Sequence, residues 1–417
     1  MQNLLFLCHR LPWPPNKGDK IRSYHVLRRL AEHYRVYLGA FVDNPEDLQY
    51  LQAVKALCSD TCVRPLGRIR AGLRACASLA RAEPLTLAYY RDAVMHRWVE
   101  GLVTKGKVDL ALCYSSGVAP YLLHHKMLRR IMDFVDVDSD KWRQYAENRR
   151  GLTGLIYRRE ARQLEEFERR VATDFDASLF VSEAEAGFFR ARAPMLAGKV
   201  HGIPNGVDTD YWDPGRDYPD PYPPEARVVV FTGAMDYWAN ADAARWFAAK
   251  VWPRVRAECP QAHLYIVGSN PSASVRALNA RDGVSVTGRV ADVRPYLAHA
   301  HVAAAPLRIA RGIQNKVLEA LAMEKVLLAT PEAYEGIEDF DGRQGAISGS
   351  PEALAAAALR ALGSAQPVRV AAARAEVLKR YQWPLLLDEY ERALGDVQPS
   401  AASVQARAGR TSLKACS

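Results

Sequence analysis

The sequence lacks long apolar runs. No stretch of about 18 apolar residues occurs, which is the length a helix needs to cross a bilayer. The first ten residues, MQNLLFLCHR, contain an apolar segment too short for the core of a signal peptide, with no basic segment before it. We therefore expect a cytoplasmic protein without a membrane-spanning segment.

Cysteine is scarce and shows no pairing pattern. The seven cysteines are an odd number, form no CxxC pair and stand at positions 8, 58, 62, 76, 113, 259 and 416. This argues against a disulfide framework and against a structural zinc site. Cys58 and Cys62 would share a face if their segment were helical, but buried thiols are a better interpretation than metal ligands.

The charge is unevenly distributed. Residues 1–205 contain 32 Lys and Arg against 23 Asp and Glu, whereas residues 206–417 contain 24 of each, so the net charge of +9 lies in the first half. A basic surface attracts nucleic acid, anionic membrane or phosphorylated substrates, or is an ordinary solvated face. Because no aromatic and basic platform or recognition motif accompanies it, we expect no nucleic-acid partner.

The pattern of apolar segments predicts an α/β protein. Short, nearly continuous apolar runs alternate with longer amphipathic stretches, which is typical of parallel strands covered by helices on both faces. With 417 residues, two successive doubly wound domains are expected. The predicted strands are 3–8, 35–42, 108–114, 131–137 and 177–182, then 227–233, 262–268, 284–288, 301–306, 326–330 and 345–348.

The predicted domain boundary lies just after Asn205-Gly206. Residues 213–224 contain five prolines without periodicity and form a loop. The predicted division is a first domain over 1–205, a second over 206–380, a C-terminal helix over 381–396 and a disordered tail over 397–417.

The sharpest chemical signal lies in residues 306–322, PLRIARGIQNKVLEALA. A strand end is followed by a basic loop and a helix, with three cations, Arg308, Arg311 and Lys316, around the helix start. Gly312 allows backbone N–H groups to approach a ligand closely. A helix N-terminus with such neighbours suits a diphosphate, and Glu319 could accept hydrogen bonds from a ribose diol. The alternative is that these are ordinary surface charges.

Two further predicted strands end in glycine, at Gly233 and Gly268, and Asn240 is a plausible N-cap for the helix after the first of them. The carboxyl ends of parallel strands meet at one edge, where open α/β sheets bind ligands. The three strand ends together predict one ligand site.

Five segments occur in a fixed order along the chain: 203–208 (IPNGVD), 231–233 (FTG), 266–268 (IVG), 287–290 (TGRV) and the helix ending in 319–322 (EALA). In these segments the chain resembles the retaining GT-B glycosyltransferases of family 4, and the resemblance covers roughly residues 1–395. A closer similarity, to sugar transferases of exopolysaccharide loci associated with exosortase systems, rests on 16–23 (NKGDKIRS), 133–142 (DFVDVDSDKW) and 312–316 (GIQNK).

The resemblance implies a nucleotide-sugar donor in the second domain, bound by Gly233, Arg289, Arg308, Arg311, Gly312, Lys316 and Glu319. The family's two-glutamate signature falls on Arg311 and Glu319, so the first glutamate is replaced. The arginine and lysine that relatives carry after the first strand of this domain are missing from residues 234–237 (AMDY). Arg308, Arg311 or Lys316 would then neutralise the leaving diphosphate.

The first domain is expected to hold the acceptor, a glycan or a polyprenyl-diphosphate-linked sugar. Gly18, Asp19, Lys20 and Arg22 follow the first strand; the glycine allows close approach of the backbone and the cations suit an anionic partner.

The predicted catalytic residues are Asp136, Asp138 and Lys316. The two aspartates end a strand and take the place of a histidine that many relatives carry elsewhere. GT-B enzymes generally work without a metal, so we expect neither metal nor cofactor.

One segment bears on location. Residues 68–81 place Ile69, Leu73, Cys76 and Ala80 on one helical face and arginines elsewhere. Such a helix can lie on an anionic bilayer or can be an ordinary packed helix. The first interpretation predicts peripheral contact with the inner face of the membrane.

The sequence thus predicts a retaining glycosyltransferase of exopolysaccharide biosynthesis. Two alternatives remain. A nucleotide-sugar epimerase would need no acceptor, and a non-catalytic binding or scaffold protein of polysaccharide assembly would fit the replacement of a glutamate by Arg311.

Overall fold

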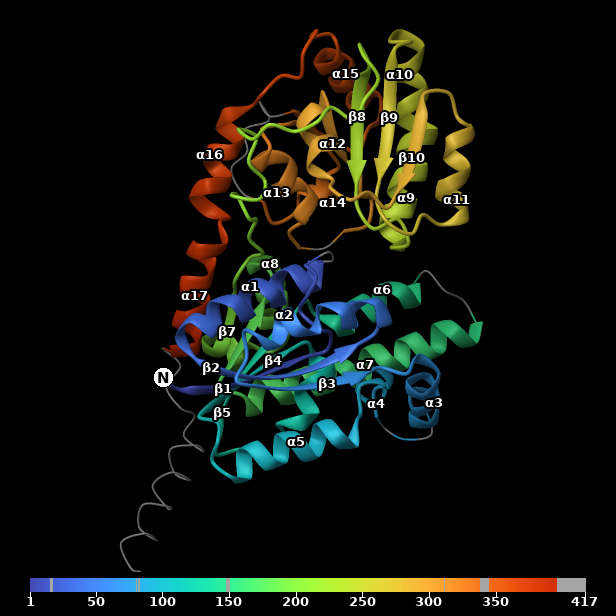
Figure 1. Cartoon of the computed structure of the whole chain (residues 1–417). Helices are drawn as coiled ribbons and strands as arrows, with labels where there is room; N and C mark the ends of the chain where they lie inside the picture. Colours follow the sequence, from blue (N-terminus) through green and yellow to red (C-terminus); the bar gives the residue numbers. More distant parts are fainter. Residues whose placement is uncertain are drawn as a thin grey trace, which may run out of the picture. The chain divides into compact units, whose positions relative to one another are not determined.

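The computed structural model describes residues 1–15, 18–79, 81, 83–147, 151–310, 312–337 and 345–395. The chain forms two compact units (Figure 1), of which unit 1 comprises Met1–Ile203 and the chain from Leu387 onward, and unit 2 comprises Pro204–Leu386. The boundary expected after Asn205 falls beside the first of these divisions. The predicted tail, 397–417, lies outside the described residues.

Unit 1 is built on a parallel sheet of seven strands in the order β3-β2-β1-β4-β5-β6-β7. The strands are β1 (Asn3–Cys8), β2 (Arg35–Val42), β3 (Asp60–Pro65), β4 (Leu110–Tyr114), β5 (Arg129–Val135), β6 (Ala177–Phe180) and β7 (Val200–Gly202). The helices are α1 (Gly18–His33), α2 (Leu51–Lys55), α3 (Arg68–Ser78), α4 (Leu85–Tyr89), α5 (Ala93–Thr104), α6 (Asp138–Glu147), α7 (Gly151–Asp174) and α8 (Glu183–Arg192), with 3-10 turns at Pro45–Tyr50, Ser116–Tyr121 and Pro194–Lys199.

Unit 2 is a second parallel sheet, of six strands in the order β10-β9-β8-β11-β12-β13. The strands are β8 (Arg227–Thr232), β9 (Ala262–Val267), β10 (Val284–Gly288), β11 (Val302–Ala305), β12 (Val326–Ala329) and β13 (Gly345–Ile347). The helices are α9 (Trp238–Trp246), continued by a π-helical turn at Phe247–Val251, α10 (Trp252–Glu258), α11 (Ala273–Arg276), α12 (Arg294–His299), α13 (Asn315–Ala322), α14 (Pro331–Tyr334), α15 (Pro351–Leu362) and α16 (Ala371–Arg380), with a 3-10 turn at Ala277–Ala280.

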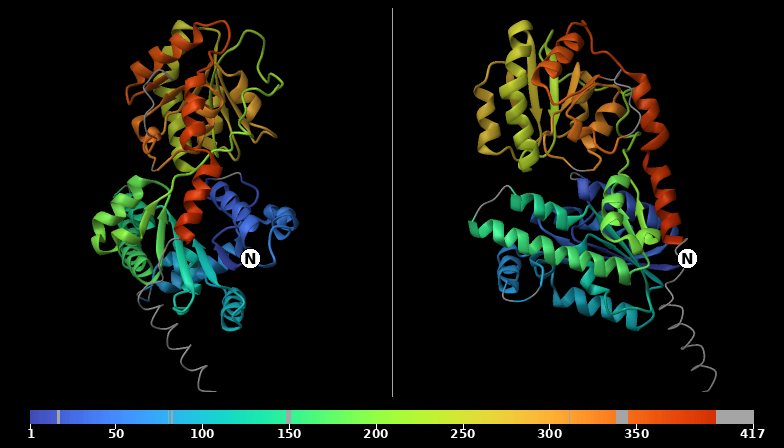
Figure 2. Two further views of the ribbon diagram at one scale, coloured as in Figure 1. Left: turned by 90° about the vertical axis from the view of Figure 1, so that its left-hand side faces the viewer. Right: turned by 180° about the vertical axis from the view of Figure 1, so that it is seen from behind.

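The predicted fold class, two doubly wound Rossmann-like domains, is confirmed. Helices lie on both sides of each sheet (Figure 2), and the central strands are buried along nearly their whole length. The last helix, α17 (Trp383–Gly395), belongs from Leu387 onward to unit 1, so the chain returns to the unit in which it began.

Strands β3 and β7 were not predicted from the sequence. Both are edge strands of the first sheet; β3 reads DTCVRP and is mostly half-buried or exposed, and β7 has three residues. Cys62 lies in β3, so the helical face it was expected to share with Cys58 does not exist. Of these two thiols, which were expected to be buried, Cys62 is buried and Cys58 is half-buried.

A buried ion pair joins four parts of unit 1. Arg22 of α1 donates from Nε to Asp133 Oδ2 of β5 at 2.8 Å, with side chains 1% and 0% exposed. Arg22 also donates from Nη1 to the carbonyl of Ile203 at 2.8 Å, and the hydroxyl of Tyr390 in α17 donates to Asp133 at 3.1 Å. Because desolvated charges need partners, these residues fix α1, β5, the end of the unit's first segment and α17 together.

Breaking this pair should destabilise unit 1. In an Asp133→Asn variant Arg22 stays buried with its counter-charge removed, and we expect a loss of about 3–5 kcal/mol in the free energy of unfolding, measured by urea denaturation. Asp388→Asn is the matched control, because Asp388 also joins α17 to α1, through Arg29, but its side chain is 59% exposed. The control should lose less than about 1 kcal/mol. Equal losses would contradict the assignment.

Candidate functional site

The strand order of unit 2 reverses between β8 and β11. At such a reversal the loops after the two central strands leave the sheet in opposite directions and open a crevice, where α/β sheets bind ligands. Here the loops are residues 233–237, between β8 and α9, and 306–314, between β11 and α13. The basic segment identified from the sequence therefore lies at the expected edge.

Three glycines bring adjacent strand ends of unit 2 into close backbone contact. The amide of Gly233 donates to the carbonyl of Val267 at 3.0 Å, and the amide of Gly268 donates to the carbonyl of Gly288 at 3.2 Å. A Cβ atom on Gly268, whose φ is +157°, would lie 1.6 Å from the carbonyl oxygen of Gly233. Glycine is thus required at position 268 for the backbones after β8 and β9 to approach this closely.

Lys316, in the first turn of α13, reaches the loop after β8. Its ammonium donates to Asn240 Oδ1 at 2.6 Å and lies 5.5 Å from the ring centroid of Phe231. Asn240 in turn donates to the carbonyl of Ala234 at 2.9 Å. Asn240 was expected as an N-cap, but the cap of α9 is Tyr237, and the Asn240 side chain instead holds Lys316 beside Gly233.

Glu319 stands one helical turn beyond Lys316 on α13, and both side chains are partly exposed. Burial lowers the pKa of Lys316 to about 8, although the negative charge of Glu319 acts to raise it. Burial likewise raises the pKa of Glu319 to about 7, against the charge of Lys316. A phosphate group near Lys316 would favour its charged form, so the site is suited to an anion.

The other predicted donor residues lie in different surroundings. The guanidinium of Arg308 binds both carboxylate oxygens of Asp242, with Nη2 2.8 Å from each, so its charge already has a counter-charge within unit 2. Arg289 is exposed after Gly288, and Gly312 is buried in a left-handed conformation with φ of 61°. Arg311 lies outside the described residues.

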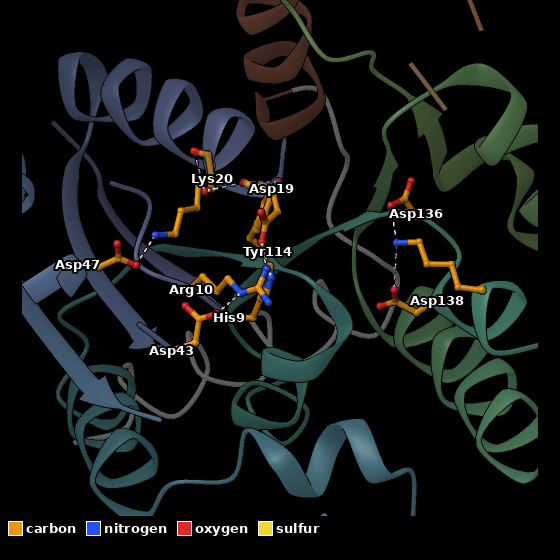
Figure 3. A network of polar contacts seen from close by, with 11 residues as sticks. His9, Arg10, Asp19, Lys20, Asp43, Asp47, Tyr114, Asp136 and Asp138 are labelled. Carbon is orange, nitrogen blue, oxygen red and sulfur yellow. Dashed lines mark hydrogen bonds and ion pairs between the residues drawn. The ribbon is translucent and has the colours of Figure 1, made fainter. Parts of the chain in front are cut away.

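In unit 1 the strand order reverses between β1 and β4, and a network of polar side chains lies at this point (Figure 3). His9 and Arg10 follow β1 directly and both contact Asp19 of α1, with His9 Nε2 3.2 Å and Arg10 Nη1 2.6 Å from Oδ2. Arg10 Nε lies 3.0 Å from Asp43 after β2, and the hydroxyl of Tyr114 donates to the carbonyl of Asp19 at 2.8 Å.

The Asp19 carboxylate of this network is stabilised by its neighbours. Burial alone would raise the pKa of Asp19, but the hydrogen bonds and charges of His9 and Arg10 hold it well below the usual range. His9 also stacks on the ring of Tyr114, with centroids 5.9 Å apart. Asp19, predicted from the sequence, is therefore part of a rigid polar edge. Gly18 is exposed at the start of α1, and the preceding Asn16 and Lys17 lie outside the described residues.

Lys20 and Arg22 were expected to meet an anionic acceptor. In the structure both are buried, and each has an internal carboxylate: Lys20 pairs with Asp47 and Arg22 with Asp133. Their charges are neutralised within unit 1. The geometry therefore corrects this part of the prediction and gives both residues a role in the fold.

Asp136 and Asp138, the predicted catalytic aspartates, lie at the carboxyl end of β5, and a single ammonium, that of Lys141, is 2.6 Å from Asp136 and 3.5 Å from Asp138 (Figure 3). The hydroxyl of Ser116, which lies in the segment after β4, donates to Asp138 Oδ2 at 3.0 Å. Val135, immediately before them, has a left-handed backbone with φ of 70°. Such strain in a β-branched residue is costly and is typical of functional edges.

His9, Arg10 and Tyr114 were not among the site residues predicted from the sequence. All three stand at the carboxyl ends of β1 and β4, the two strands flanking the reversal, so the strand-end rule applied to unit 1 would have found them. Among the described residues, no group of three or more His, Cys, Asp or Glu could hold a metal ion.

The glycine edge of unit 2 gives a testable prediction. Gly268→Ala should destabilise the protein by several kcal/mol in urea denaturation, above the roughly 1 kcal/mol of an average substitution, because the new methyl collides with the Gly233 backbone. The control is Gly101→Ala in α5, where a Cβ meets no atom of the described residues within 4 Å. It should be neutral or slightly stabilising. A stable Gly268→Ala protein would refute the close approach.

Comparison with known proteins agrees with the folds of both units. Residues 226–364 match the family Glycosyl transferases group 1. No curated protein matches the sequence of the chain.

Solved structures of GT-B enzymes are similar over nearly the whole chain. Anabaena Alr3699/HepE, in complex with UDP and glucose, has 14% identity and a TM-score of 0.65, and the match covers 95% of this chain and 100% of that one. Sucrose-phosphate synthase from Thermosynechococcus elongatus has 15% identity and a TM-score of 0.67, covering 95% and 99%. WaaG, a glycosyltransferase involved in lipopolysaccharide biosynthesis, has 15% identity and a TM-score of 0.63, covering 93% and 98%. The family match thus covers part of unit 2, and the solved structures share the two-domain fold of the whole chain.

Proposed function

We propose that the chain transfers a sugar, with retention of configuration, from a nucleoside-diphosphate sugar to a glycan or a polyprenyl-diphosphate-linked acceptor. The observation that carries the proposal is the position of Lys316. Its ammonium lies at the N-terminus of α13, beside the glycine edge of β8, where a helix start and a cation together suit a diphosphate.

The donor contacts follow from this position. The N–H groups at the start of α13 and the ammonium of Lys316 would hold the diphosphate, and Glu319, one turn on, would accept hydrogen bonds from the ribose hydroxyls. As the glycosidic bond breaks, negative charge grows on the departing phosphate, and a preorganised cation stabilises that charge. The acceptor hydroxyl would attack from the face that the diphosphate leaves, and its proton would pass to the departing phosphate oxygen.

Unit 1 would supply the acceptor side. Asp136 and Asp138 remain our candidates for polar groups at the reaction centre, and Gly18 and Asp19 for acceptor contacts. We propose a role in exopolysaccharide biosynthesis, with the protein in the cytoplasm and peripheral at the inner face of the membrane. No helix in the described part of the chain is long and apolar enough to cross a bilayer.

Two other functions make different predictions. An epimerase would alter the sugar and release nucleotide without any acceptor. A non-catalytic scaffold, favoured by Arg311 in place of the family glutamate, would bind the donor without turnover. Incubation with a panel of nucleoside-diphosphate sugars and a membrane lipid extract, following released nucleotide and labelled lipid, separates all three; the anomeric configuration of the product, read by NMR, tests retention.

Substitution of the two α13 residues should separate binding from turnover. Lys316→Ala should lower the turnover number by about 10²–10³-fold, because it removes stabilisation of the leaving group. Glu319→Ala should weaken binding of UDP-glucose, the first donor to try, by about tenfold or more in calorimetry, because hydrogen bonds to a charged acceptor are lost. Lys250→Ala and Glu332→Ala, at exposed positions of unit 2, are the matched controls. Full turnover in Lys316→Ala would overturn the assignment.

The shifted pKa values predict a bell-shaped pH dependence of donor affinity. Glu319 must be ionised to accept the ribose hydrogen bonds, so affinity should fall as the pH drops through about 7. Lys316 must be protonated, so affinity should also fall as the pH rises through about 8. Lys316→Arg should abolish the alkaline limb, because arginine stays charged, and leave the acidic limb in place. Unchanged limbs in that variant would assign the titration to other groups.

A further inference from the structure

The helix α3 has an apolar face that the described residues of unit 1 do not cover. Ile69 is 81% exposed and Leu73, one turn on, is 66% exposed; Cys76 continues the same face and is also exposed. The opposite face holds the helix in place, since Arg74 donates to the carbonyls of Ala88 and Tyr89 at 3.3 and 3.2 Å. Bare branched side chains on a well-anchored helix indicate a surface with a partner.

Two further exposed apolar side chains lie at the start of α7. Leu152 and Leu155 are 74% and 60% exposed. Arg159, one turn after Leu155 on the same helical face, donates to the carbonyls of Ser78, the last residue of α3, and of Arg81, at 3.0 Å for Ser78, so this part of α7 lies near the C-terminal end of α3. We call the set Ile69, Leu73, Cys76, Leu152 and Leu155 the apolar patch.

Exposed arginines lie next to the patch, Arg81 after α3 and Arg158 and Arg162 on α7. Residues 66–82 contain four arginines and no acidic residue, and Arg81 is exposed. On α7 the exposed charges next to the leucines are Arg158 and Arg162, whereas Glu160 is buried and accepts from the amides of Leu85 and Thr86. Exposed apolar side chains with a basic rim are the composition of a surface that inserts at the interface of an anionic bilayer.

We propose that the apolar patch docks unit 1 on an anionic lipid bilayer, with its side chains among the acyl chains and the arginines at the headgroups. This docking rests on the proposed function, because a polyprenyl-diphosphate-linked acceptor is confined to the membrane surface. A cavity of about 360 Å³ borders the same region, lined by Glu83 after α3, Tyr90 and His96 among others. Tyr90 contacts His9 of the polar network, with ring centroids 5.9 Å apart.

The test is sedimentation of the full chain with lipid vesicles. Vesicles of phosphatidylcholine and phosphatidylglycerol should bind the protein, pure phosphatidylcholine should bind it far less, and added salt should weaken binding. Ile69→Ser combined with Leu73→Ser should weaken binding at least about tenfold. Met195→Ser is the matched control, because Met195 is also 81% exposed in unit 1, and it should bind as the native chain does.

The charged rim is tested in the same assay. Arg158→Gln with Arg162→Gln should cost about fivefold in binding for each charge removed. Lys105→Gln with Lys107→Gln removes the same charge at other exposed positions of unit 1 and should leave binding nearly unchanged. Equal losses in both pairs would overturn docking by the patch and indicate a diffuse effect of net charge.

Insertion itself can be read at Cys76. In a Cys416→Ser background, a polarity-sensitive fluorophore on Cys76 should shift to the blue when anionic vesicles are added, and the same dye on Met195→Cys, with Cys76→Ser, should not. If the patch variants instead convert a dimer to a monomer in light scattering and native protein ignores vesicles, the occupant is a second copy and the proposal fails. Binding of UDP-glucose without vesicles tests the donor site separately, so the failure of one leaves the other measurable.

Discussion

The organisation of unit 1 depends on one desolvated charge pair, Arg22 with Asp133. Neither side chain reaches water, so each ion needs the other, and Tyr390 supplies a further hydrogen bond from a helix late in the sequence. The same arginine holds the carbonyl of Ile203, where the chain leaves the unit. A buried ion pair is weak as a source of stability but demanding in geometry, because any arrangement that separates the charges is heavily penalised. It therefore selects one placement of α1, β5 and α17.

The two candidate sites follow a common constraint. In each unit the strand order reverses once between central strands, and side chains after those strands converge because parallel strands end at one edge. In unit 2 the result is a cation, Lys316, at a helix start beside closely approached glycines. In unit 1 it is a network in which His9 and Arg10 hold the Asp19 carboxylate. The same topology thus provides an edge of unit 2 that suits an anionic diphosphate and an edge of unit 1 whose polar side chains bind one another.

The sequence predicted the central strands well, because strands buried on both faces read as continuous apolar runs. It missed β3 and β7, which at the sheet edge need little apolar surface. For the site, Lys316 and Glu319 were found from a local pattern of loop and helix. Arg22 was misassigned because its counter-charge, Asp133, is 111 residues away, and no local pattern reveals which distant carboxylate neutralises a cation. Periodicity likewise identified the apolar face of α3 but left open whether the face is covered, because covered and exposed amphipathic helices have the same pattern.

The return of α17 to unit 1 has a consequence for synthesis. Domains usually fold in order as the chain leaves the ribosome, the N-terminal one first. Here Tyr390 and Glu391, which bond to Asp133 and Arg29, are translated after the whole of unit 2. The unit that is begun first is therefore completed last, and a chain truncated after Leu386 would keep a full second unit while the first lacks its final partners. Complete translation is in this way a condition for the finished first unit.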